Sequence, residues 1–388
     1  MNREFLLEAV LGITIGLLLA VVAMYRTSKP PSAGVLRRAG MVGVLVYALV
    51  AAQALVQSGM TWIGVLFLLV LLAATVGASV AGRSRSSTGP SSDWTRRLVG
   101  VGLTTAMLIA AGQTLSMVGL VDPRVVVLVI AVMAALFVAR AELASSSRVG
   151  SLAMWLMVVP VVIALALGVL LGDPGQALSP IIEVTGLEWA TVVGLLVSFA
   201  ALGWSDPGMR SRLEGHAGVP IRMLVGVGLV VLLICGGLLM FFGGAILAPS
   251  MQFFVVPANI DALPGLAGVL IAVVTVLFIA LTTATMSGIA DGTVKWLAIG
   301  AAASTVLALI DPGLDRVVIA TSLVAAVLVG SRGERGTRLG LAAALIGIVT
   351  LTVTGQLTFG WPAALAAVVV AAIAAVAPAT HEASAEAV

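Results

Sequence analysis

Residues 263–292 read LPGLAGVLIAVVTVLFIALTTATMSGIADG, and this stretch decides the fold. No charged residue lies between Leu263 and Ala290. A helix of about 20 apolar residues crosses the hydrocarbon core of a bilayer, so the run predicts a membrane-spanning helix rather than the core helix of a soluble domain. Hydroxyl groups in hydrocarbon need a carbonyl, another helix, water or an ion as partner. The stretch ends in a group of four hydroxyls, those of Thr282, Thr283, Thr285 and Ser287.

The composition of the whole chain indicates the same solvent. Of its 388 residues, 61% are hydrophobic and 10% are charged, and the mean hydropathy is +1.20. A soluble domain of this size could not cover itself with polar surface, so we predict an all-α, polytopic membrane protein. The single cysteine, Cys235, has no disulfide partner within the chain, and His216 and His381 have no second metal ligand nearby.

About thirteen apolar segments are long enough to be transmembrane helices. They lie roughly at residues 6–25, 40–57, 61–82, 98–119, 124–140, 150–172, 187–204, 221–247, 264–288, 294–310, 315–330, 339–355 and 360–377. The first is not a secretory signal, because it begins with Glu4 and Glu8 and is followed by Arg26 and Lys29, which is the reverse of a signal peptide. We expect a single transmembrane domain that ends in a cytoplasmic tail, residues 379–388.

The basic residues predict the orientation of the chain. If the N-terminus is external, every second loop is cytoplasmic, and these loops hold 17 of the 20 Lys and Arg residues. Only Arg3, Arg124 and Arg316 are then external. Such an excess of positive charge is typical of the cytoplasmic side. We therefore expect a cell-membrane protein with its N-terminus outside and its C-terminus inside, and assign the basic pI of about 9.6 to sidedness rather than to nucleic-acid binding.

Ten of the predicted spans fall into two units of five. Because five is odd, the second unit enters the membrane from the opposite side, as in inverted-repeat transporters whose sites lie near the midplane. The third span of each unit carries a threonine pair, Thr104–Thr105 and Thr282–Thr283. The predicted organisation is an extra helix and loop (residues 1–38), the first repeat (39–172), the second repeat (186–331) and two C-terminal helices (338–378).

Three segments resemble the sodium/solute symporter family, whose members have a five-plus-five inverted-repeat core with one helix before it and others after it. Residues 110–162, AAGQTLSMVGLVDPRVVVLVIAVMAALFVARAELASSSRVGSLAMWLMVVPVV, are similar to the family's fourth-to-sixth helix region. Residues 263–291 resemble its ninth helix. Residues 203–223, GWSDPGMRSRLEGHAGVPIRM, resemble the cytoplasmic link between its seventh and eighth helices. The resemblance covers nearly the whole chain and implies sodium-coupled symport of a small solute.

The resemblance also implies where sodium would bind. Backbone carbonyls of a broken helix, here the second span near Val50 to Gln53, would face hydroxyls of the ninth span. Those hydroxyls would come from Thr282, Thr283 and Thr285. The second span departs from the family, because MVGVLVYALVAAQALVQSGM lacks a Ser- and Gly-rich break. The alternative for the threonines is a hydrogen bond back to a carbonyl four residues earlier in the same helix.

Three polar residues within spans are candidates for contacting the solute. Gln53 and Gln113 are amides, which in membranes either join helices or bind a substrate. Ser198 lies between two glycines in the seventh span, WATVVGLLVSFAALGW, which suits an interrupted helix.

Several features that other functions require are missing from the sequence. No ionisable residue lies in the middle of a span, which disfavours a buried proton relay. The loop after the second span, QSGMT, lacks the acidic residues that a lipid-linked glycosyltransferase would need. No nucleophile-base pair, P-loop or cofactor motif is present, so we expect neither an enzyme nor a cofactor other than sodium.

Two functions fit these observations. The first is a sodium-coupled secondary transporter of a small neutral or zwitterionic solute, with membrane lipid as its other partner. The second is a membrane scaffold or subunit that has a transporter fold and no working ion site. The second span distinguishes them, because an uninterrupted helix opposite Thr282 and Thr283 would favour the scaffold.

Overall fold

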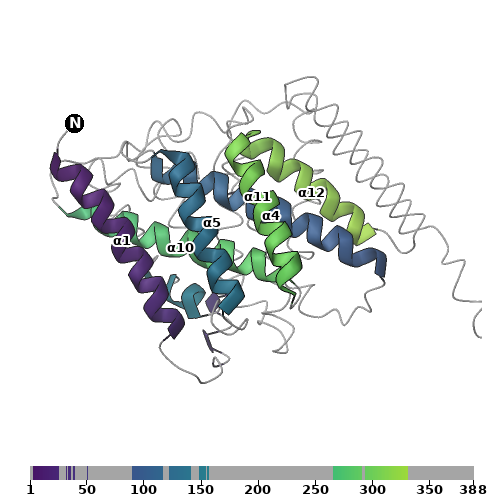
Figure 1. Ribbon diagram of the computed structural model, residues 1–388, viewed down its shortest axis with the longest axis horizontal. Helices are drawn as coiled ribbons and strands as arrows, with labels where there is room; N and C mark the ends of the chain where they lie inside the picture. The colour runs from purple at the N-terminus through teal and green to yellow at the C-terminus, as the bar shows by residue number, and fades with distance from the viewer. Residues whose placement is uncertain are drawn as a thin grey trace, which may run out of the picture.

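The computed structural model describes residues 3–25, 32, 34–35, 38–39, 50, 90–116, 122–140, 148–153, 155–156, 265–290 and 293–330. Its helices are α1 (Arg3–Tyr25), α4 (Pro90–Ser116), α5 (Pro123–Arg140), α10 (Leu266–Ala290), α11 (Val294–Ile310) and α12 (Leu314–Gly330) (Figure 1). None of the described residues lies in a β-strand. The all-α prediction is therefore confirmed for this part of the chain.

These six helices coincide with six of the predicted spans. The largest difference is at α4, which begins at Pro90 rather than at residue 98. Its first residues are a polar helical segment, and the part that could span a membrane is Arg97–Ser116. The span predicted at 150–172 is described only at its start, where residues 148–153, 155 and 156 are helical. Apart from Val50, the spans predicted within residues 40–82, 187–247 and 339–377 lie outside the described residues.

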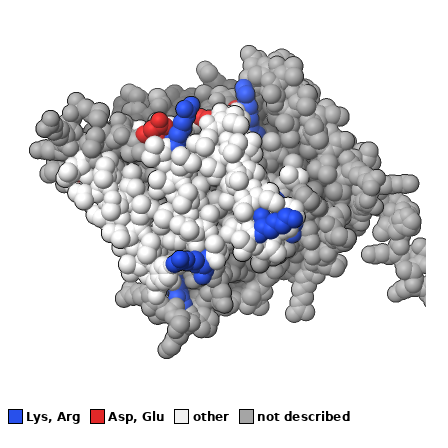
Figure 2. Space-filling view, viewed as in Figure 1, with Lys and Arg blue, Asp and Glu red and all other residues white. Residues whose placement is uncertain are grey.

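Four of the described helices are long and apolar enough to cross a membrane: α1, α4, α5 and α10. A fifth, α11, is apolar but shorter. On the face drawn in Figure 2, Lys, Arg, Asp and Glu lie at the upper, lower and right-hand margins of the described surface, and the band between them carries none of these residues. Such a band matches the hydrocarbon core of a bilayer, so the chain is an integral membrane protein.

Short sequence signals set the ends of the helices. Asp122 caps α5, because its side-chain oxygen accepts a hydrogen bond from the Arg124 backbone N–H at 2.8 Å, and Pro123 occupies the first helical position, where no backbone donor is needed. Asp311 ends α11 in the left-handed conformation with φ of 49°, and Pro312 follows it. Gly265, with φ of 83°, precedes α10.

α10 lies at the centre of this arrangement. It contacts α1, α4, α5 and α11, and it passes behind α1 and α5 in the view of Figure 1. Of its apolar segment, 94% is buried. The side chains that fill the centre include Phe278 and Leu270, both fully buried on α10, and Leu103 and Leu108 on α4. α4 in turn contacts α5, α11 and α12.

α1 packs closely along the N-terminal half of α10. A Cβ atom added to Gly12 would lie 2.5 Å from the carbonyl oxygen of Gly268, and one added to Gly16 would lie 2.7 Å from that of Ala272. Small residues four apart allow two membrane helices to approach to backbone contact in this way. The Glu8 carboxylate also accepts a hydrogen bond from the Gly265 backbone N–H at 3.0 Å. The helix predicted to precede the repeats is thus seated on the predicted ninth span.

Candidate functional site

The three threonines predicted to bind sodium lie together on the most buried helix. Thr282, Thr283 and Thr285 are 0%, 1% and 4% exposed, and they lie within the last nine residues of α10. Successive residues of a helix are about 100° apart, so Thr282 and Thr285 share a face while Thr283 points to the side. No charged residue lies within α10. The site is therefore a neutral group of hydroxyls.

The hydrogen bonds of α10 separate these hydroxyls into two kinds. Thr275, nearer the start of the helix, donates to the Ile271 carbonyl at 2.7 Å, and Ser287 donates to the Ala284 carbonyl at 2.7 Å. Thr285 donates to the Thr282 and Leu281 carbonyls at 3.1 and 3.3 Å. These three follow the alternative in which a helical hydroxyl bonds back to its own helix.

Thr282 and Thr283 do not follow it. Their Oγ1 atoms are buried and have no hydrogen-bond partner among the described residues. A buried polar group without a partner costs about 1–3 kcal/mol, so two such groups side by side require an explanation. A third hydroxyl of this kind is that of Thr114 on α4, which the sequence did not single out.

One hydrogen bond joins the two predicted repeats at this site. The Thr104 hydroxyl of α4 donates to the Thr285 Oγ1 atom at 2.8 Å, and both residues are buried. Its neighbour Thr105 instead donates to the Val101 carbonyl of its own helix at 2.8 Å. The threonine pairs of the two spans thus lie on contacting helices, but the contact is made by Thr104 with Thr285 rather than by the two dipeptides.

Packing beside this hydrogen bond brings three helices into close contact. Ile289 of α10 lies between Gly100 of α4 and Gly300 of α11, and an added Cβ atom on either glycine would collide with its side chain. Ser304 of α11 donates to the Val101 carbonyl of α4 at 3.3 Å. The backbones of α4 and α10 are therefore held close together by packing that does not involve the threonine hydroxyls.

Of the candidate solute residues, the structure describes Gln113, which does not lie at these threonines. Gln113 is half-buried on α4, nine residues beyond Thr104, which corresponds to about 13 Å along a helix. Its backbone carbonyl accepts a hydrogen bond from the Ser116 hydroxyl at 3.1 Å. Gln53 and Ser198 lie outside the described residues. Of the segment predicted to supply sodium with carbonyls, only Val50 is described, and it is helical and buried.

The available ligand atoms indicate which cation could bind. Among the described residues no group of three His, Cys, Asp or Glu side chains could hold a metal ion. Unwound backbone carbonyls hold sodium near the midplane of inverted-repeat transporters, and a hydroxyl oxygen is likewise a neutral oxygen ligand. The unpartnered Oγ1 atoms of Thr282 and Thr283 fit such a ligand set.

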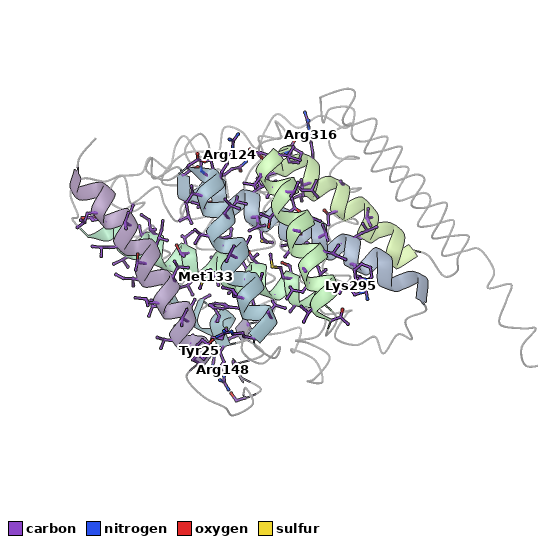
Figure 3. All side chains as sticks on the ribbon, in the orientation of Figure 1. Tyr25, Arg124, Met133, Arg148, Lys295 and Arg316 are labelled. Carbon is purple, nitrogen blue, oxygen red and sulfur yellow. The ribbon has the colours of Figure 1, made fainter. Side chains whose placement is uncertain are left out.

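Charged residues mark the two ends of the bundle. Figure 3 draws Arg124 and Arg316 at its upper edge, Tyr25 and Arg148 at its lower edge and Lys295 at its right-hand side. Arg124 and Arg316 are two of the three arginines predicted to be external, and Arg148 and Lys295 are predicted to be cytoplasmic. Next to Lys295 in the chain, the Trp296 ring has its centre 4.2 Å from the Arg97 guanidinium, a cation–π contact that suits a membrane interface.

Comparisons with known proteins bear on the fold. No family model matches the chain, and no curated protein matches it. The chain is similar to a solved structure of a Na+-coupled sialic acid symporter, whose substrate-bound, outward-open state reveals a novel Na+-site. The match covers 96% of this chain and 97% of that chain, with a TM-score of 0.54 and 9% sequence identity. At this identity the likeness is one of fold, and the chain has a symporter-like, all-helical membrane fold.

Proposed function

We propose that the chain is a secondary active transporter, rather than an enzyme, and that it couples entry of a small organic solute to sodium. The observation that carries this proposal is the pair of buried hydroxyls of Thr282 and Thr283, which have no hydrogen-bond partner among the described residues. In lipid such groups remain costly unless an ion or a polar ligand meets them. Sodium is the ion that a neutral set of oxygens fits, since the described helix carries no charge to balance a divalent cation.

α10 would supply three hydroxyl oxygens from one side of the ion, those of Thr282, Thr283 and Thr285. The second span near Val50 to Gln53 would supply carbonyls from the other, because interrupted helices free the carbonyls that sodium needs. The fold supports this arrangement, since it is shared over nearly the full length of a protein described as Na+-coupled. Gln53, Gln113 and Ser198 are the residues we assign to the solute.

The described helices are also compatible with two inverted repeats. α4 and α5 are the predicted third and fourth spans of the first repeat, and α10 and α11 are those of the second. Each of these four helices contacts the other three. We further propose that the N-terminus is outside and the C-terminus inside the cell membrane, a sidedness that the loop charges favour.

The proposed coupling is tested by sodium-dependent thermal stabilisation of the purified protein. An ion that binds the folded state raises its stability by RT ln(1 + [Na+]/Kd), so the melting temperature should rise as sodium replaces potassium or choline at constant ionic strength. Reconstituted vesicles with an inward sodium gradient should then accumulate the solute. A melting temperature that is the same in all three salts would favour the alternative, a scaffold or subunit with a degenerate transporter fold.

A further inference from the structure

We propose that Thr104 is a positioning residue for sodium: it orients the Thr285 hydroxyl so that one lone pair of its oxygen faces the ion. This inference rests on the proposed function, because it concerns how the same site is held. It extends that function to α4, a helix on which no sodium ligand has been assigned.

The hydroxyl of Thr285 can make three interactions, one as a donor and two as an acceptor. Its proton is directed to the Thr282 and Leu281 carbonyls, at 3.1 and 3.3 Å, within its own helix. Thr104 fills one of the two lone pairs by donating a hydrogen bond at 2.8 Å. A single lone pair is left, and its direction is fixed because both of the other interactions are fixed.

This arrangement suits a cation ligand. A hydroxyl whose proton pointed at the ion would repel it. Here the Thr285 proton points instead to backbone carbonyls of α10. Thr282 lies three residues before Thr285 on the same face, and its own Oγ1 atom is buried and without a partner. The oriented Thr285 oxygen thus lies on the same face of α10 as the Thr282 hydroxyl assigned to sodium. Without Thr104, the Thr285 side chain could rotate to another staggered rotamer.

The role is specific to Thr104 and is separable from helix packing. Thr105 is equally buried, but its hydroxyl serves its own helix through the Val101 carbonyl. The contact of α4 with α10 is also maintained by Ile289, which lies against Gly100. Since valine has nearly the shape of threonine, Thr104→Val should remove the hydrogen bond and leave this packing unchanged.

The experiment is a sodium titration of thermal stability for the full-length wild type, Thr104→Val, Thr104→Ser and the matched control Thr105→Val. We expect Thr104→Val to weaken apparent sodium affinity about threefold or more, the effect of losing one average hydrogen bond in a membrane protein. Thr104→Ser keeps the hydroxyl and should restore the affinity of the wild type. Thr105→Val should bind sodium like the wild type.

The possible results separate this inference from the function on which it rests. A wild type that responds to sodium together with a Thr104→Val variant whose affinity equals that of Thr105→Val would overturn the positioning role and leave sodium coupling intact. A wild type without any response would overturn both. A merely structural role for Thr104 would lower the sodium-free melting temperature without changing affinity. If Thr104→Val does not fold, Thr104→Ala is measured against Thr105→Ala with the same expectations.

Discussion

α10 and α1 are both long apolar helices in direct contact, yet they have different surroundings. The apolar segment of α10 is 94% buried, whereas that of α1 is 28% buried. Val10, Leu18 and Val22 of α1 are each more than half exposed and face away from the protein. An apolar helix in a membrane protein can thus serve as the centre of the bundle or as its lipid-facing boundary.

Their hydroxyl groups differ in the same way. Thr14 of α1 is exposed, and its hydroxyl donates to the Val10 carbonyl at 2.7 Å, so lipid meets only a satisfied group. Thr282 and Thr283 of α10 are buried in protein and have no such bond. A buried hydroxyl without a hydrogen-bond partner is costly inside the protein as well as in lipid. We therefore explain these two hydroxyls by a bound ligand.

Equal truncations on the two helices should have the most unequal effects. Leu277 of α10 is 1% exposed and Leu18 of α1 is 58% exposed. Leu277→Ala should lower the free energy of unfolding by about 2–5 kcal/mol, because it leaves a cavity in packed protein. Leu18→Ala should change it by about 0.5 kcal/mol or less, as is usual for surface positions. Denaturation in mixed micelles measures both, and equal losses would mean that α10 is not central.

A smaller effect is expected where the two helices meet. Gly16→Leu would place a side chain on the Ala272 carbonyl and should cost about 1–3 kcal/mol, since overpacking forces the helices apart. The control is Ile15→Leu, on the exposed face of α1, which should cost little.

A disulfide can report the same contact without a stability measurement. A Cβ atom on Gly268 would lie 3.9 Å from that of Glu8, a distance that suits a disulfide, so Glu8→Cys with Gly268→Cys should cross-link in a Cys235→Ser background. Gly16→Leu should slow this cross-linking and Ile15→Leu should not. Equal rates in both variants would contradict the seating of α1 on α10.

The smallest expected effect is a difference in stability between valine substitutions of a threonine on α1 and a threonine on α10. In sodium-free buffer, Thr14→Val should lower stability slightly, because hydrogen bonds of this type average about 0.6 kcal/mol in a membrane protein. Thr282→Val should leave stability unchanged or raise it by about 1 kcal/mol, since it removes an unsatisfied buried hydroxyl. Thermal unfolding of the two variants decides, and a larger loss for Thr282→Val would mean that its hydroxyl has a protein partner.

The positions of the described helices could be predicted well from the sequence. α11 was expected at residues 294–310, where the structure has it, and α5 was expected one residue later than its start at Pro123. An Asp-Pro pair marks the start of α5 and another marks the end of α11. Apolar runs of membrane length leave few alternatives for the rest of each helix.

The faces of these helices could not be predicted. Lipid and protein interior are both apolar, so α1 and α10 are apolar all round and neither has a stripe to show which side is buried. The sequence shows the two threonine pairs. It does not show which faces of their helices meet, so the hydrogen bond of Thr104 to Thr285 could not be predicted. The unpartnered state of Thr282 and Thr283 depends on side-chain geometry within α10, which spacing alone does not determine.

Binding of radioactive sodium to the purified protein tests the central claim most directly. The variant is Thr282→Val with Thr283→Val, and the matched control is Thr275→Val, which removes an equally buried hydroxyl of α10 that is bonded to its own helix. We predict that the wild type and Thr275→Val bind sodium alike and that the double variant binds it about tenfold more weakly or worse, a loss of about 1.4 kcal/mol or more. Equal sodium affinity in all three proteins would contradict the claim that Thr282 and Thr283 are buried without partners in order to hold an ion.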